Sequence, residues 1–127
     1  MAIQLWTGRV EAKEETPTNT GLNFRQGAQV TIVSSGYARN DPQADYFGPC
    51  GFHRFFGDSA PAPDENIGAL LVKTGKIYTA VGGGLLKWPP PTDDNVEFVY
   101  NDTRGNYSNN DGGFDVTMQY DDKDLLA

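Results

Sequence analysis

Hydrophobic side chains recur at every second position along much of this chain, and no segment shows the spacing of an amphipathic helix. The clearest run is 114–121, in which Phe114, Val116, Met118 and Tyr120 share one face and acidic or polar residues fill the other. Such alternation is typical of a β-strand with one face in a core and the other in solvent. The sequence therefore predicts an all-β fold.

Comparable runs predict about eight short strands. They cover residues 4–12, 20–25, 28–38, 66–74, 76–81, 84–88, 96–101 and 114–121. We predict a small sandwich of two antiparallel sheets of about four strands each, with a jelly-roll-like connection. The strands at 96–101 and 114–121 are expected to be antiparallel neighbours, joined by the loop between them. Residues 69–72 are apolar on both faces, which indicates a central strand that is buried on both sides.

Length and charge limit the class of protein. We expect one domain over residues 1–127. A net charge of −7 and a pI of about 4.4 argue against nucleic acid and anionic membranes as partners. Cys50 is the single cysteine, so no intramolecular disulfide can form. No signal peptide is recognisable and no run approaches the roughly 20 apolar residues of a membrane span. We therefore expect a soluble protein that is cytoplasmic, released without a signal peptide, or already processed.

The most unusual segment is 100–113, where four asparagines and two aspartates lie in one turn-rich run between two predicted strands. Their side-chain oxygens are hard donors, which suit a calcium ion. Asp102 and Asn110 would lie about 28 Å apart in a fully extended chain. Both can bind one ion only if the loop turns back, which Gly105 permits. An asparagine-rich turn without a ligand has the same composition, so these residues alone leave both interpretations open.

A second long irregular stretch runs over residues 40–66 and contains five of the fifteen aromatic residues. They are Tyr46, Phe47, Phe52, Phe55 and Phe56. Loops of this length are uncommon in compact domains unless they have a function. The rings can cap one end of the sandwich, or they can present a flat face to a sugar.

Several segments together resemble one known family. They are residues 6–10, 31–38 and 68–73, and the ordered motif Tyr100-Asn101-Asp102-x-x-Gly105-x-Tyr107-x-Asn109-Asn110-x-Gly112. With these residues the chain resembles, nearly end to end, the bacterial galactophilic calcium-dependent lectins, whose type member is the galactose-specific lectin of Pseudomonas. The resemblance implies two four-stranded sheets, a homotetramer, and one calcium ion per subunit at the end that carries the asparagine-rich loop.

In that family the ion is held by protein oxygens and by two neighbouring hydroxyls of the bound sugar. The implied metal ligands are the side chains of Asp102, Asn109 and Asn110 and the backbone oxygens of Asn40 and Asn106. The implied sugar-binding residues are Asp102, Thr103, Asn106 and Asn109, with His53 or Asp64 near the exocyclic hydroxymethyl group. Galactose is the expected sugar, since its C3 and C4 hydroxyls form the axial and equatorial pair that such a site accepts.

The chain departs from the family pattern in one loop. The family places a His-Pro-x-Gln group against the sugar, whereas His53 is followed here by Arg54 and two phenylalanines. Arg104 stands where the family usually has proline. We predict that metal binding is kept, and that galactose-containing glycans are the partners.

Catalysis is not expected. A glycosidase needs two carboxylates across a cleft, and none of the acids pairs in that way. His53 has no recognisable nucleophile partner for a triad. The alternative to a lectin is a calcium-braced interaction module that binds a protein or another glycan through the aromatic 46–56 stretch.

Overall fold

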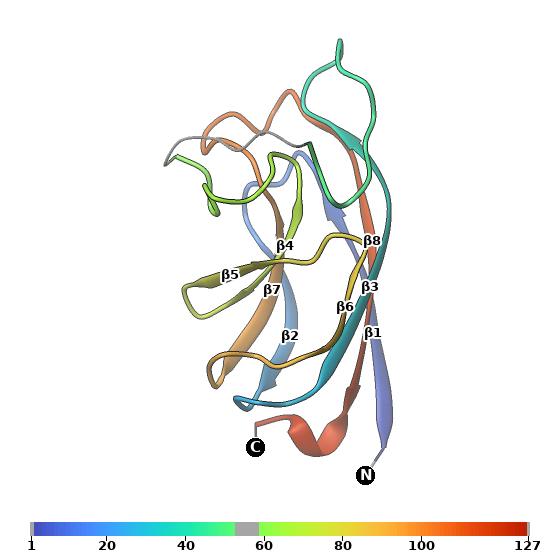
Figure 1. The fold of residues 1–127 in the computed structure, drawn as a ribbon, viewed down its shortest axis with the longest axis vertical. Coiled ribbons are helices and arrows are strands. Elements are labelled where there is room, and N and C mark those ends of the chain that lie inside the picture. Colours follow the sequence, from blue (N-terminus) through green and yellow to red (C-terminus); the bar gives the residue numbers. More distant parts are fainter. Residues whose placement is uncertain (1, 53–58, 127) are drawn as a thin grey trace.

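The computed structural model describes residues 2–52 and 59–126 (Figure 1). Within these ranges the strands are β1 (Ile3–Glu11), β2 (Thr18–Phe24), β3 (Val30–Arg39), β4 (Leu70–Thr74), β5 (Ile77–Ala80), β6 (Gly84–Trp88), β7 (Asp94–Tyr100) and β8 (Asp111–Asp121). A single turn of 3-10 helix, Asp122–Asp124, follows β8. No helix in this part of the chain is long and apolar enough to cross a membrane. Each predicted strand has a counterpart, with boundaries shifted by a few residues.

The strands form two four-stranded sheets, in the orders β1-β8-β3-β6 and β2-β7-β4-β5. First and last strands pair with each other, then second and seventh, third and sixth, and fourth and fifth. This is the pairing of a long antiparallel hairpin that is wrapped into two layers, as in a jelly roll. The predicted sandwich of two antiparallel sheets is confirmed.

One pairing predicted from the sequence is wrong. β7 and β8 are not neighbours, because β7 pairs with β2 and β4 while β8 pairs with β1 and β3. The segment 101–110, called here the asparagine loop, therefore crosses from one sheet to the other over the end of the core. Consecutive strands pair in most folds but not in all, and ten residues are long enough to span two layers.

The core lies between the sheets and is built from the inward faces predicted by alternation. Phe114, Val116 and Met118 of β8 are fully or almost fully buried. Trp6 of β1 stacks on Phe98 of β7 with ring centroids 5.7 Å apart, which joins the two layers. The core thus fixes how the ends of β7 and β8 lie relative to each other.

The predicted burial of 69–72 on both faces is also confirmed. Leu70 and Val72 belong to the core between the sheets, while Ala69 and Leu71 lie in a second buried cluster. That cluster includes Ala62, so the connection between β3 and β4 covers the outer face of its sheet.

Three connections gather at one end of the sandwich, opposite the two chain termini (Figure 1). They are residues 12–17, the described parts 40–52 and 59–69 of the connection between β3 and β4, and the asparagine loop, and we call this region the loop end. The antiparallel strands of both sheets bring these segments together although they are far apart in the sequence. Any site that uses more than one of these segments must lie here.

A buried hydroxyl in the core provides a stability test. Thr74 Oγ1 is buried without a hydrogen-bond partner in the part of the chain that the structure describes, and an unsatisfied buried group of this kind costs about 1–3 kcal/mol. Thr74→Val should therefore raise the free energy of unfolding by about 1 kcal/mol, measured by urea denaturation.

Thr20 is the matched control, since its Oγ1 donates to the Val96 carbonyl over 2.7 Å and accepts from the Leu22 amide. Thr20→Val should lower the free energy of unfolding by about 1 kcal/mol. A loss of stability in both variants would contradict this description of Thr74.

Candidate functional site

The asparagine loop begins with a buried side chain that fastens a neighbouring loop. Asn101 is fully buried, and its Nδ2 donates to the carbonyls of Ala62 (3.0 Å) and Asn66 (2.9 Å). Its Oδ1 accepts from the Ala62 amide at 3.1 Å. Asn101 therefore binds the 62–66 segment to the end of β7. Sequence reasoning counted Asn101 among the loop asparagines without assigning it a role.

Asp102 and Asn110, eight residues apart, are brought into direct contact. Asn110 Nδ2 donates to Asp102 Oδ2 over 2.7 Å, and the two residues are 1% and 3% exposed. Gly105, between them, has a φ of 85°, a value that glycine adopts without steric cost. The loop thus turns back on itself at the predicted position.

Asn110 has a buried oxygen without a donor. Its Nδ2 bonds both Asp102 Oδ2 and the Ala12 carbonyl, at 2.7 and 2.9 Å. Because both partners are acceptors, the amide orientation is fixed with Nδ2 toward them. Asn110 Oδ1 then remains buried with no hydrogen-bond partner among the described residues. Buried acceptors are nearly always satisfied, so this oxygen is available to a cation or another ligand.

The Asp102 carboxylate is buried without a neutralising cation. Its Oδ1 accepts from the Thr103 amide at 2.7 Å, but no ion pair to Asp102 forms among the residues that the structure describes. Burial raises the pKa of Asp102, and nearby Glu15 raises it further, while the bonds from Asn110 and Thr103 oppose the shift. A positive charge at this position would therefore stabilise the ionised carboxylate.

Two tyrosines form the scaffold beneath this pair. The Tyr107 hydroxyl donates to the Tyr100 carbonyl over 2.6 Å and accepts from the Asp102 amide at 3.3 Å. Burial raises the pKa of Tyr107 to about 12, so its hydroxyl keeps its proton near neutral pH. The Tyr100 hydroxyl in turn donates to Asn40 Oδ1. The scaffold links the asparagine loop to the residue after β3.

The other predicted site residues lie outside the buried Asp102–Asn110 pair. Thr103 is half-buried, and its amide is already bonded to Asp102. Asn106 and Asn109 are exposed on the asparagine loop, and the Asn106 amide closes a turn on the Thr103 carbonyl at 3.0 Å. Asp64 is exposed on the neighbouring loop. His53 lies outside the described residues.

Asn40 is also a predicted ligand, through its backbone oxygen. It is half-buried, and its side-chain oxygen is taken by the Tyr100 hydroxyl. The backbone carbonyl of Asn40, which is the predicted ligand, takes no part in this bond.

The donor set fits a hard cation. Within residues 2–52 and 59–126, no three His, Cys, Asp or Glu side chains lie close enough together to bind a metal by themselves. The candidate donors are instead one carboxylate, amide oxygens and backbone carbonyls, which are calcium ligands rather than ligands of zinc. The buried, unpaired Asn110 Oδ1 beside a buried carboxylate is consistent with such an ion.

The aromatic 46–56 stretch divides between structural and exposed rings. Phe47 and Phe52 contact each other with centroids 4.3 Å apart, and Phe47 also packs against Tyr100. These two rings cap the core, as one of the two interpretations predicted. Tyr46 is exposed, and Phe55 and Phe56 lie outside the described residues.

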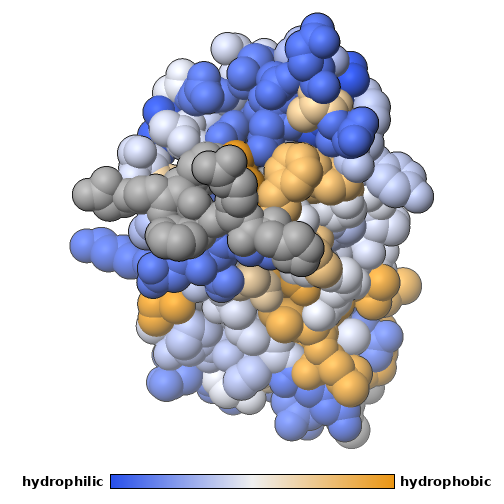
Figure 2. Space-filling model, turned by 45° about the horizontal axis from the view of Figure 1, so that its top comes forward, coloured by the Kyte–Doolittle hydropathy of each residue, from blue (hydrophilic) through white to orange (hydrophobic). Residues whose placement is uncertain are grey.

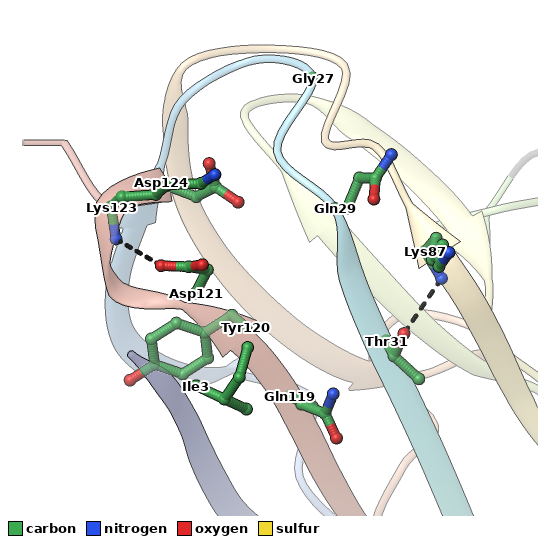
Figure 3. Close-up of a pocket in the computed structure, with 10 residues that line it drawn as sticks. All are labelled: Ile3, Gly27, Gln29, Thr31, Lys87, Gln119, Tyr120, Asp121, Lys123 and Asp124. Atoms are coloured by element: carbon green, nitrogen blue, oxygen red, sulfur yellow. Dashed lines mark hydrogen bonds between the residues drawn. The ribbon is translucent and has the colours of Figure 1, made fainter. Parts of the chain in front are cut away.

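A separate cavity of about 510 Å³ lies at the opposite end, near the chain termini (Figure 3). It is lined by Thr31 and Lys87 on one side and by Asp121, Lys123 and Asp124 on the other. None of the predicted metal or sugar residues that the structure describes lines it, so it is distinct from the candidate site.

Comparison with known proteins decides the family. The sequence profile of the PA-IL-like proteins matches residues 5–123. The chain belongs to the PA-IL-like family. It is 28% identical over 118 residues to "Lectin A" of Photorhabdus laumondii subsp. laumondii, covering 89% of each chain. Its fold is similar to a solved structure described as the EclA N-terminal domain, a PllA-like lectin, with a TM-score of 0.77 and 27% identity. That match covers 91% of this chain and 96% of the other.

The lectin resemblance predicted from the sequence is therefore confirmed at the level of the family. In this PA-IL-like protein the family motif coincides with the asparagine loop, whose geometry is described above.

Asn101 supplies a test of how the loop end is held together. Asn101→Ala removes three hydrogen bonds, two of them buried, and takes away the acceptor of the Ala62 amide. The carbonyls of Ala62 and Asn66 keep their bonds from the Glu65 and Ala69 amides. We expect the free energy of unfolding to fall by about 2–3 kcal/mol in urea denaturation.

Asn19→Ala is the control, because this exposed asparagine only closes a turn on the Gly21 amide. That substitution should cost less than about 0.5 kcal/mol. Equal effects of the two substitutions would show that the Asn101 network does not hold the loop.

Proposed function

We propose that this protein is a calcium-dependent lectin that binds galactose and galactosides without catalysing a reaction. The observation that carries the proposal is the buried Asn110 Oδ1, which has no partner among the described residues and adjoins the buried Asp102 carboxylate. A calcium ion would satisfy both groups at once. The family, whose named relatives are lectins, supports a sugar as the ligand.

Five protein oxygens are proposed to hold the ion. They are the side-chain oxygens of Asp102, Asn109 and Asn110 and the carbonyls of Asn40 and Asn106. Calcium takes about 6–8 oxygen ligands, so five from the protein leave about one to three positions for a ligand. When bound, the ion would polarise two neighbouring hydroxyls of the sugar.

The chain's own residues would orient the sugar. Asp102 and Asn109 would bond the hydroxyls beside them, with Thr103 and Asn106 contributing from the same loop. Asp64, exposed on the neighbouring loop, and His53 are the candidates for the exocyclic hydroxymethyl group. An axial and an equatorial hydroxyl on adjacent carbons are present in galactose and absent from the C3–C4 pair of glucose, which supports galactose as the preferred sugar. The surface in Figure 2 is hydrophilic over much of the upper part of the view, as suits a polar ligand.

The family resemblance also supports a homotetramer. The outer face of the β1-β8-β3-β6 sheet exposes Ile3, Leu5, Val33 and Leu86, which an interface between subunits would bury. Several sugar sites on one assembly would raise avidity by roughly 10²–10⁴ where the spacing of a glycan surface allows simultaneous binding. The mass in solution, compared with the 13.9 kDa subunit, tests this assembly.

Asp102→Asn tests the metal site without relying on sugar binding. In the wild-type protein, calcium at about 100 times its dissociation constant should raise the free energy of unfolding by about 2.7 kcal/mol. The variant should lose this increase, because its amide carries no negative charge to attract the ion.

Asp115→Asn is the control, since this exposed carboxylate pairs with Arg9 on the outer face of the sheet, away from the asparagine loop. It should keep the full response to calcium. Equal stabilisation of wild type and Asp102→Asn by calcium would contradict the proposed ligand set. Calcium binding without galactose binding would instead favour the interaction module.

A further inference from the structure

Beside the loop end, the chain after β3 folds back along that strand. Ala38 and Phe47 exchange both backbone hydrogen bonds, at 2.9 and 2.8 Å, so residues 46–47 extend the edge of β3 in an antiparallel manner. Phe47 packs against the core. Since successive side chains of an extended strand point to opposite faces, Tyr46 lies on the outer face of the sheet.

The ring of Tyr46 is held across that face by two contacts. Its hydroxyl donates to Asp111 Oδ2 over 2.6 Å, and the Arg39 guanidinium carbon lies 4.5 Å from its centroid. Arg39 pairs in register with Asp111 of β8 and forms an ion pair with it at 3.4 Å. Tyr46 therefore reaches over Arg39 to Asp111, with one face of its ring on the guanidinium.

This arrangement contributes little to the fold. Tyr46 is 50% exposed, and neither buried cluster includes it. The Arg39–Asp111 ion pair is only partly buried and spans 3.4 Å, so it adds modest stability at most. Tyr37, two residues before Arg39 on the same face, is 71% exposed. Of the large hydrophobic side chains exposed in the described part of the chain, these two are the aromatic ones. The ring of Tyr46, held in place, and the ring of Tyr37 on β3 lie beside the Arg39 guanidinium and the Asp111 carboxylate. Together these groups form a flat amphipathic surface.

Such a surface has the chemistry that a saccharide requires. The CH face of a pyranose can lie on the open face of Tyr46, while its hydroxyls can bond Arg39 as a donor and Asp111 as an acceptor. The surface also adjoins the proposed calcium site along both strands. Asp111 directly follows Asn110, and Arg39 directly precedes Asn40, with the side chains on the outer side of the sheet.

We propose that the surface formed by Tyr46, Arg39 and Asp111, with Tyr37 at its margin, is a second saccharide subsite. It binds the sugar residues that follow a terminal galactose in an oligosaccharide. This inference rests on the proposed function, because the terminal galactose is the residue placed at the calcium ion.

The test is a comparison of ligand lengths by calorimetry, in calcium. Wild type, Tyr46→Ala and Tyr46→Phe are titrated with galactose and with a panel of α- and β-linked galactose-terminated trisaccharides. We expect at least one trisaccharide to bind wild type about threefold to tenfold more tightly than galactose. Tyr46→Ala should lose this gain and keep its galactose affinity within about twofold. Tyr46→Phe, which keeps the ring but not the bond to Asp111, should retain part of the gain.

Tyr78→Ala is the matched control. Tyr78 is also a tyrosine with a nearby cation, Lys73 Nζ at 5.8 Å from its ring, but it lies on the other sheet. Tyr78→Ala should change neither the affinity for galactose nor the affinity for the trisaccharides. Trisaccharides that bind no more tightly than galactose, or a gain that survives in Tyr46→Ala, would overturn the subsite alone. Failure of wild type to bind galactose would overturn the proposed function and the subsite together.

Discussion

The contact between Asp102 and Asn110 determines how the loop end of this protein is arranged. The two side chains come from the start and the end of a loop that passes from one sheet to the other. Their hydrogen bond therefore closes the loop across the top of the core. It also leaves a carboxylate and an amide oxygen buried together, an arrangement that is unfavourable unless something positive binds there.

Hydrogen bonds from the surrounding loops and strand ends hold this pair. Tyr107 bonds the backbone of Asp102 to that of Tyr100, and Tyr100 reaches Asn40. The carbonyl of Ala12, from the connection between β1 and β2, accepts the second hydrogen of the Asn110 amide. Because these partners sit at the ends of strands in both sheets, packing of the sandwich holds Asp102 and Asn110 in place. A ligand that binds these two side chains would therefore pay little for ordering them.

Alternation of side chains was sufficient to predict the strands, the two layers and the doubly buried segment 69–72. It was not sufficient to predict which strands pair, since β7 and β8 each carry a face that suits either sheet. The motif around Asp102 and Asn110 predicted candidate ligands. It did not indicate that Asn101 would hold the neighbouring loop or that Tyr107 would support the pair from below. Their roles depend on Ala62 and the Tyr100 backbone, which only the folded chain brings near. Tyr46 was noted as aromatic, yet its contact with Asp111 spans 65 residues and has no sequence signature.

The central claim is that one buried site holds both a calcium ion and the hydroxyls of galactose. It is tested most directly by titrating galactose into the same preparation by calorimetry, first loaded with calcium and then after chelation, with glucose as the reference sugar. The account predicts galactose binding in calcium, none after chelation, and recovery when calcium is restored, with glucose silent throughout. Galactose binding that persists in the chelated, folded protein would contradict it.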